Sequence, residues 1–151
     1  MSHGIRAALE GRQLDPLDPS IYWSVLALDV DVSDHRNRVL FATLVGGLKT
    51  IRIEQPITAP RGLPNDVSQP VREHIDQWGP EAWDVSWVSY DEFAAAVQRL
   101  HSYAARMHKE REHQTFLANH LGIAPQAILD FLKVYEDHGY ATRVVFWSTP
   151  L

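Results

Sequence analysis

The chain has 151 residues, 14 Lys and Arg against 19 Asp and Glu, and 45% hydrophobic residues, which excludes a disordered chain and is typical of one globular domain with its own core. It contains no cysteine, so disulfides, thiolate zinc sites and a cysteine nucleophile are excluded. The formal net charge of −5 argues against nucleic acid as a partner, because a broad basic face is missing.

The first segments predict an arm followed by a strand. Residues 1–20 combine glycines, prolines and scattered charges, which is typical of a loosely ordered N-terminal arm, and 21–151 are predicted to form a single α+β domain with C-terminal helices. Residues 21–32 are β-branched and aromatic and end in strict alternation, so they predict a strand. The charged start differs from a signal peptide, and no apolar run approaches the roughly 20 residues that cross a bilayer. We therefore expect no membrane segment and a cytoplasmic location.

A helix and a long loop are predicted next. Residues 36–45 carry apolar side chains at helical spacing, and the two glycines at 46–47 provide a stop. Residues 48–54 alternate between apolar and charged side chains, as a strand does. Four prolines then interrupt any regular element, so 55–80 are expected to form a long ordered loop.

The second half predicts two helices and a closing strand. Residues 89–92 have the Ser-x-x-Glu spacing of a capping box, so a helix is expected over 90–117 or beyond. Another helix is expected from 124 until Gly139 ends it, followed by a strand over 140–147. The elements predict an α+β fold, a small and mainly antiparallel sheet with helices packed on one face. Because short strands leave open edges, we also expect a homo-oligomer.

The most specific local pattern is residues 60–68, Pro-Arg-Gly-Leu-Pro-Asn-Asp-Val-Ser. Two prolines stiffen the segment, Gly62 leaves its backbone N–H accessible, and Arg61 offers a planar fork of donors that suits phosphate or carboxylate. Asp66 or Ser68 is placed to cap a following turn. The alternative interpretation is a rigid connector in which Arg61 only pairs with a surface acid.

Further short motifs lie along most of the chain. They are Arg36-Asn37, Leu40-Phe41-Ala42, Leu44, Gly46, Pro56-Ile57, Trp78-Gly79, Ser86-Trp87 and Arg143-Val144-Val145-Phe146. With these motifs and the segment 60–68, the chain resembles a widespread group of uncharacterised tailed-bacteriophage proteins over about residues 36–147. The resemblance implies a phage accessory protein acting in the bacterial cytoplasm. The group's Gly-Cys-Asp-Ile-His opening and the histidines before its Ser-Trp pair are absent here, where 83–85 read Trp-Asp-Val, so any metal site that those histidines build is not expected in this chain.

Metal-ligand patterns are weak in this sequence. The paired histidines of the predicted helices lie two turns apart, which is about 10 Å along the helix axis and too far for one ion. Asp29 and Asp31 with a histidine are the alternative, as ligands of a metal-dependent phosphodiesterase, and Asp34 is close enough in sequence to join them. Strand-end acids facing water are the commoner outcome, so we predict no metal and no cofactor.

Residues 117–132 resemble a helix-turn-helix with Gly122 at the turn, followed by a strand in the position of a wing. The second helix offers Gln126 and Lys133 to DNA, but it also carries Asp130. A recognition helix needs basic or amide groups facing phosphates and base edges. A helical hairpin packed on the sheet is therefore the favoured interpretation of this segment.

The function that these patterns favour is non-enzymatic binding of a small anionic, nucleotide-like ligand. The predicted ligand-binding residues are Arg36, Asn37, Arg61, Gly62, Asp66, Ser68, Trp78 and Trp87. The arginines would clamp phosphate, one of them at a helix start, and the tryptophans would stack on a base. Such a protein would act as a counter-defence sponge that sequesters a host immune signal. The alternatives are a helix-turn-helix DNA-binding regulator or a protein-binding inhibitor using the C-terminal helices, and the phosphodiesterase.

Overall fold

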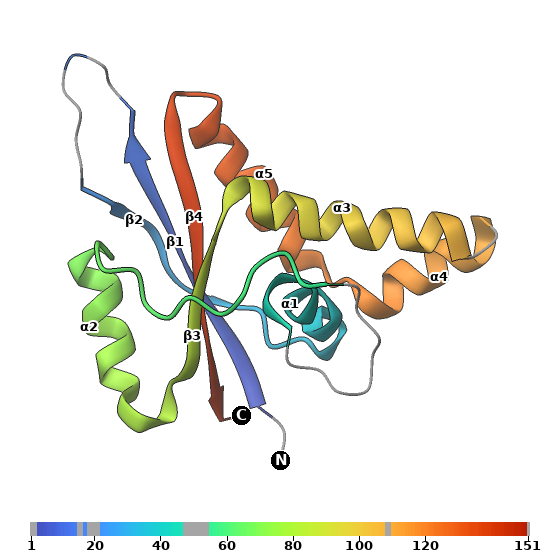
Figure 1. Cartoon of the computed structure of the whole chain (residues 1–151), viewed down its shortest axis with the longest axis horizontal. Coiled ribbons are helices and arrows are strands. Elements are labelled where there is room, and N and C mark those ends of the chain that lie inside the picture. The colour runs from blue at the N-terminus through green and yellow to red at the C-terminus, as the bar shows by residue number, and fades with distance from the viewer. Residues whose placement is uncertain (1–2, 15–16, 18–21, 47–54, 108–109, 151) are drawn as a thin grey trace.

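The computed structural model describes residues 3–14, 17, 22–46, 55–107 and 110–150 (Figure 1). In chain order its elements are β1 (His3–Gln13), β2 (Ser24–Asp31), the 3-10 helix η1 (His35–Asn37), α1 (Arg38–Val45), α2 (Gln69–Trp78), the 3-10 helix η2 (Gly79–Glu81), β3 (Trp83–Ser89), α3 (Tyr90–Met107), α4 (Glu110–His120), α5 (Ile123–Glu136) and β4 (Tyr140–Pro150). No helix of these described residues is long and apolar enough to span a bilayer.

The four strands form one antiparallel sheet in the order β2-β1-β4-β3. The two longest strands, β1 and β4, pair along their whole length in the middle of the sheet, from His3 opposite Pro150 to Gln13 opposite Tyr140. The predicted α+β class is confirmed, as are the strand at 24–31 and the closing strand. The alternating stretch 48–54 lies outside the described residues.

The prediction of a loosely ordered arm was wrong for residues 3–13, which form the inner strand β1. Its apolar residues Ile5, Ala7 and Leu9 alternate with Arg6, Glu10 and Arg12, and only Ala8 interrupts the alternation. Glu10 is fully buried and pairs with Arg143 on β4. The glycines, prolines and charges of residues 1–20 led to the prediction of an arm, because the sequence does not show that Glu10 has a buried partner as distant along the chain as Arg143.

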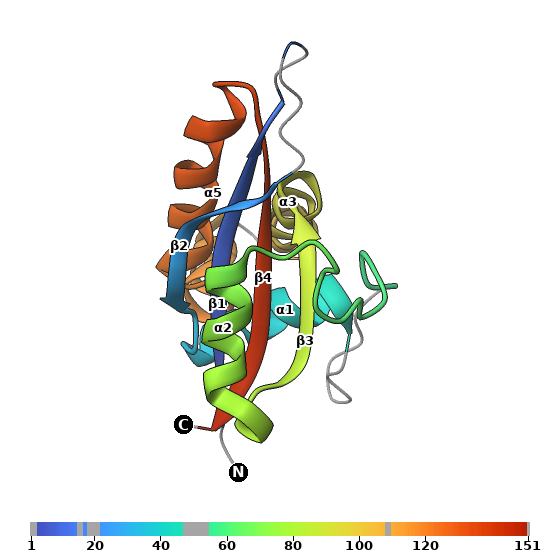
Figure 2. The ribbon, with the colours of Figure 1, turned by 90° about the vertical axis from the view of Figure 1, so that its left-hand side faces the viewer.

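Helices cover both faces of the sheet. Figure 1 shows α1, α3 and α5 on one side of it and α2 on the other. Figure 2 views the sheet from the α2 side, with α5 behind the β2–β1 side and α3 behind the β4–β3 side. The main helical layer agrees with the expectation of helices gathered on one face, and α2 adds a smaller layer opposite.

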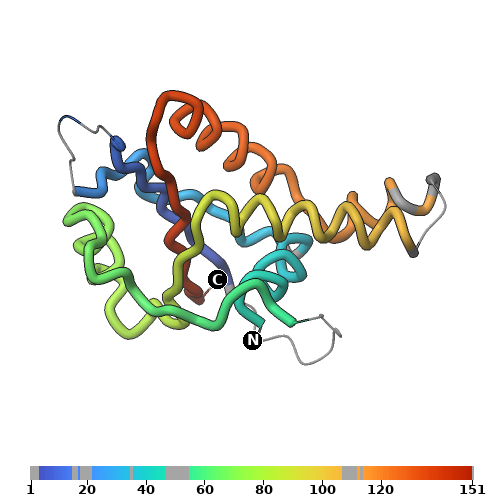
Figure 3. Tube along the Cα trace, turned by 45° about the horizontal axis from the view of Figure 1, so that its top comes forward, coloured from blue at the N-terminus to red at the C-terminus, as the bar shows by residue number. Residues whose placement is uncertain are grey.

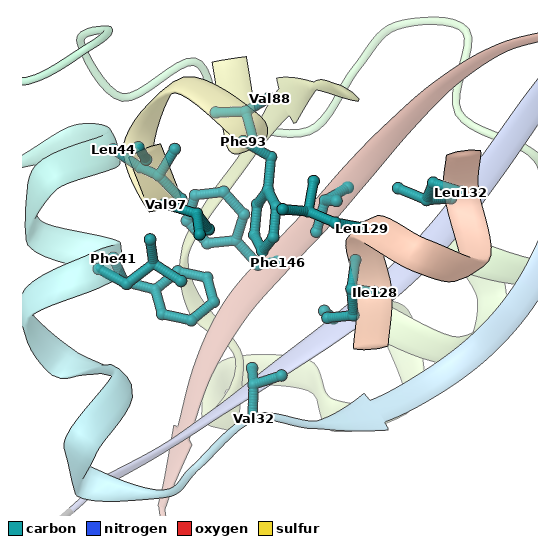
Figure 4. Close-up of a cluster of buried hydrophobic side chains, with 14 of the residues drawn as sticks. Val32, Phe41, Leu44, Val88, Phe93, Val97, Ile128, Leu129, Leu132 and Phe146 are labelled. Carbon is teal, nitrogen blue, oxygen red and sulfur yellow. The ribbon is translucent and has the colours of Figure 1, made fainter. Parts of the chain in front are cut away.

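The main core lies between the sheet and α1, α3 and α5. Phe93 of α3 and Phe146 of β4 point into it, and Leu129 of α5 closes it from the other side (Figure 4). The rings of Phe41 and Phe146 are 5.1 Å apart at their centroids and tilted, as favourable aromatic pairs are. Helix α5 packs on this core through one face, because its residues Ile128, Leu129 and Leu132 are buried there.

A second, smaller core lies under α2, where a long loop was expected. Val71 and Ile75 of α2 pack on Val145 and Trp147 of β4. Pro70 stands in the first turn of α2, where its missing N–H costs no helical hydrogen bond, so the proline did not prevent a helix. The loop prediction over 55–80 was therefore wrong at α2, and β3 was not predicted.

The predicted helix over 90–117 consists of two helices that pack on each other and project from the sheet (Figures 1 and 3). The capping box is confirmed: Glu92 N–H donates to Ser89 Oγ at 3.2 Å, and Ser89 N–H donates to Glu92 Oε1 at 2.9 Å. Tyr103 of α3 contacts Phe116 of α4 with ring centroids 5.3 Å apart. The described residues of α3 and α4 thus form a helical arm that leads into α5.

Candidate functional site

Arg61 is held by groups of the protein itself. Its Nη1 and Nη2 donate to Glu92 Oε1 and Oε2 at 2.7 and 2.6 Å, which is the bidentate geometry of a strong ion pair. Its guanidinium lies over the ring of Trp87, 4.4 Å from the centroid. Its backbone N–H donates to Ser86 Oγ at 3.0 Å. The segment around Arg61 is thereby fastened to β3 and to the start of α3.

Glu92 therefore has two partners, Arg61 and the backbone of the capping box. The hydrogen bonds from Arg61 lower the pKa of Glu92, and the Ser89 bonds act in the same direction against the opposing effect of burial. This carboxylate stays ionised in mildly acidic solution. An external anion at Arg61 would have to replace it.

Arg61 is the last member of an alternating row that we call the arginine–tryptophan ladder: Arg12, Trp23, Arg143, Trp87 and Arg61. The guanidinium carbon of Arg143 lies 3.9 Å from the centroid of Trp23 and 5.7 Å from that of Trp87. Arg12 lies 5.3 Å from Trp23. Each tryptophan thus contacts two guanidinium groups, as cation–π partners do.

The centre of the ladder is a buried ion pair. Arg143, 3% exposed, donates from Nε to Glu10 Oε1 at 2.8 Å, and Glu10 is fully buried. The other carboxylate oxygen of Glu10 accepts from the Ser68 backbone N–H at 2.7 Å, at the N-terminus of α2. The position where a helix binds an anion is therefore taken by a carboxylate of this chain.

Asp66 joins the same network from the solvent side. It accepts from Arg143 Nη1 at 2.9 Å and from the indole N–H of Trp23 at 3.1 Å. Burial raises the pKa of Asp66, but the hydrogen bonds from Arg143 and Trp23 outweigh this effect and the pKa is lowered. Arg143 pairs with both Glu10 and Asp66, and Arg61 pairs with Glu92, so the carboxylates of the network equal the three arginines of the ladder in number.

The structure divides the predicted ligand-binding residues among three places. Five of them lie together at the ladder: Arg61, Gly62, Asp66, Ser68 and Trp87. Trp78 lies at the other end of α2, where Arg6 is 5.9 Å from its ring centroid. Arg36 and Asn37 lie on η1, beside α4 and α5.

The arginine and the asparagine of η1 also have internal partners. Arg36 pairs with Asp34, whose hydrogen bond raises the pKa of the guanidinium. Asn37 is buried, and its Oδ1 accepts from the Gly122 N–H at 2.8 Å. These residues tie η1 to the α4–α5 turn instead of joining the ladder.

Four members of the ladder network were not predicted from the sequence: Glu10, Arg12, Trp23 and Arg143. Glu10 and Arg143 sit opposite each other on paired strands, but residues 133 positions apart give no local signal. One local signal could have indicated the buried ion pair: Arg143 is an ionisable residue inside a largely apolar strand, β4, and such a residue needs a partner when it is buried.

Asp29 contacts a histidine and an arginine, and this arrangement differs from a metal site. His74 Nε2 lies 2.8 Å from Asp29 Oδ2, and Arg6 Nη1 lies 3.4 Å from Asp29 Oδ1 and 4.0 Å from Asp31 Oδ2. Hydrogen bonds from Ser33 lower the pKa of Asp31. An arginine between two acids occupies the space that a cation would take, and no cluster of three potential metal ligands occurs within the described ranges.

The outer face of α5 has two parallel stripes. The α5 apolar stripe consists of Ile123, Ala127, Phe131 and Val134, and the α5 polar stripe consists of Gln126, Asp130, Lys133 and Asp137. Ile123 is 82% exposed, Val134 58% and Phe131 39%. The spacing of four, four and three residues places the apolar side chains along one side of the helix.

The side chains of the α5 polar stripe pair with one another. Gln126 Nε2 donates to Asp130 Oδ1 at 2.9 Å, and Lys133 Nζ donates to Asp137 Oδ2 at 2.9 Å. Helices α4 and α5 do flank a turn at Gly122, as predicted for residues 117–132. The second of them, however, presents two aspartates and an apolar stripe, which DNA phosphates disfavour.

Comparison of the chain with protein-family models, curated proteins and solved structures finds no match.

Proposed function

We propose that this protein acts through contact with another protein, made by the α5 apolar stripe. The observation that carries the proposal is that Ile123 and Val134 stand exposed at the two ends of one continuous apolar row on a helix whose opposite face is buried. Exposed apolar surface of this kind is commonly covered by a partner. An amphipathic helix that places its apolar row in a groove of another protein is a recurrent way of doing so.

The alternative of DNA binding by the same helices is less well supported. The exposed face of α5 carries Asp130 and Asp137 against Lys133 alone, and Lys133 is already paired. Non-specific DNA affinity depends on cations that neutralise phosphates. An acidic helix face beside an apolar one supports a protein partner instead.

The test is the size of the native complex in concentrated extracts of cells that produce the protein. Wild type is expected to migrate well above its monomer mass of 17.2 kDa, and Val134→Glu is expected to migrate as the monomer. Gln77→Glu is the matched control, because it adds the same charge on the exposed face of α2. Equal migration of all three proteins would contradict the proposal.

A second candidate function is the binding of a small anionic, nucleotide-like ligand at the ladder, as a phage counter-defence sponge in the bacterial cytoplasm. The observation that favours it is the gathering of Arg12, Arg143 and Arg61 around two tryptophans at one end of the sheet. The ligand would have to displace Glu92 from Arg61, because that pair satisfies the guanidinium.

Calorimetry with a panel of cyclic and linear nucleotides tests this second candidate. Heat of binding in wild type, lost in Arg61→Ala and kept in Arg36→Ala, is the expected result. Arg36 serves as the control because it lies on η1, away from the ladder. Absence of heat with the wild-type protein over the whole panel would eliminate the candidate.

A further inference from the structure

We propose that the partner covering the α5 apolar stripe is a second copy of this chain, whose own α5 lies antiparallel to the first across a two-fold axis. The inference rests on the proposed function, because it names the partner of the same face. Its basis is that the stripe complements itself in size and that the polar stripe beside it carries both signs of charge.

The positions of the four apolar residues make the α5 apolar stripe complementary in size to a second copy of itself. When the two-fold axis passes level with residue 129, each position faces the one equally far on the other side of it. Ala127 of one copy then faces Phe131 of the other, and Ile123 lies within one residue of facing Val134. A large ring opposite a methyl group is how two helices interdigitate at close distance. In a parallel pair, Phe131 would meet Phe131 and Ala127 would meet Ala127.

The α5 polar stripes of the two copies lie on the same side of such a helix pair. Lys133 of one copy comes level with residue 125 of the other, next to Gln126, and it lies nearer to Asp130 than to the second Lys133. The two Asp130 carboxylates are the like charges closest to the axis. We therefore expect Asp130→Asn to strengthen the association and Lys133→Glu to weaken it.

The expected strength follows from the size of the contact. Fourteen residues make α5 about 21 Å long. One pair of helices of this length buries less than the roughly 1,200–2,000 Å² of a standard stable interface. The protein also carries a net charge of −5, which opposes self-association at low ionic strength. Association that depends on concentration and increases with moderate salt is therefore expected.

Sedimentation velocity over a range of concentrations gives the first test. Wild type is expected to shift from monomer to dimer with rising concentration, and Val134→Glu to weaken the dimer at least tenfold. Gln77→Glu is expected to behave as wild type. Both substituted side chains are exposed, so the variants keep their cores. Wild type that stays monomeric, or a dimer that Val134→Glu leaves intact, would overturn the inference.

Disulfide trapping tests the antiparallel register. Because the chain has no native cysteine, only the introduced thiols can form a disulfide. Ala127→Cys and Phe131→Cys proteins are oxidised separately and as a mixture, with Gln77→Cys as the control. The mixed species, in which position 127 of one copy is linked to position 131 of the other, is expected to form faster than either self-linked species. Faster self-linking would overturn the antiparallel pairing. A monomer in sedimentation that still enters a Val134-dependent complex in extracts would overturn the second copy as partner and leave the proposed function standing.

Discussion

At the scale of single residues, the pair of Glu10 and Arg143 is the most consequential contact of the molecule. Both side chains are almost fully withdrawn from water, and the carboxylate receives two further constraints, from the Ser68 N–H and from its place on the inner strand β1. Desolvating two charges is costly, so such a pair contributes little net stability while both partners are present. Removing one partner leaves the other buried and uncompensated.

We therefore expect Arg143→Met to lower the free energy of unfolding by about 3–5 kcal/mol. The double variant Glu10→Gln with Arg143→Met should be less destabilised than Arg143→Met alone, because no buried charge is then left over. Urea denaturation of wild type, the single variants Arg143→Met and Glu10→Gln, and the double variant measures this. A double variant that loses the sum of the two single effects would show that the charges do not depend on each other.

Glu92 predicts how stability depends on pH. The Arg61 hydrogen bonds lower the pKa of Glu92 in the folded protein, so its contribution is fully present above the unfolded pKa of roughly 4.3. The contribution is lost as pH falls through the lower, folded value. The melting temperature of wild type should fall when the pH is lowered from 5, and Glu92→Gln should reduce this fall because the variant has no carboxylate to protonate at this position. The control Glu73→Gln on α2 should leave it unchanged, and an identical pH profile for Glu92→Gln and wild type would contradict the assignment.

At the scale of elements, the turn between α4 and α5 depends on Gly122. Its N–H donates to Asn37 Oδ1, and a Cβ added at this position would lie 2.9 Å from that same oxygen. Asn37 is buried and cannot swing away into solvent. The turn therefore sets the direction in which α5 leaves the helical arm.

Gly122→Ala is expected to destabilise the protein by about 1–3 kcal/mol through this clash. In an Asn37→Ala background the same substitution should cost less, because the obstructing side chain is gone. Thermal or urea unfolding of the four proteins completes the cycle. If Gly122→Ala costs as much without Asn37 as with it, the contact is not the cause.

Elements whose pattern is local were predictable from the sequence. The strand at 24–31 alternates, α1 and α5 have helical spacing with glycine near their ends, and the capping box marks the start of α3. Strand β1 and helix α2 were missed although each has a local pattern. In β1 the charged residues obscured it, since burying Glu10 depends on the distant Arg143, and in α2 Val71, Ile75 and Trp78 have helical spacing among prolines that indicated a loop.

Strand β3 illustrates a different obstacle to prediction. It is short, and Asp84 within it has a φ of 53°, which bends the strand where its pairing with β4 shifts. For the segment 60–68, the ion pair between Arg61 and Glu92 agrees with the alternative of a rigid connector in which Arg61 pairs with an acid of the chain. The sequence could not show which acid this is, because the two residues meet only in the folded chain.

At the scale of the whole molecule, the ladder and its ion pairs lie at one face of the sheet, and three of the exposed large apolar side chains of the described residues lie on α5 in the opposite layer. The ladder and its three carboxylates close the end of the α2 layer. On the opposite layer, α5 is buried along one side and apolar along part of its outer side. This arrangement supports α5 as the surface that binds another molecule. It assigns the ladder a structural role, because its contacts hold the segment 60–68 against the sheet.

Photo-crosslinking in living cells tests this arrangement most directly. A photoreactive amino acid replaces Val134 on the α5 apolar stripe, and in a second protein it replaces Gln77 on the exposed face of α2. We expect a discrete protein–protein adduct after illumination from position 134 and none from position 77. An adduct from position 77 alone, or no adduct from position 134, would contradict α5 as the contact surface.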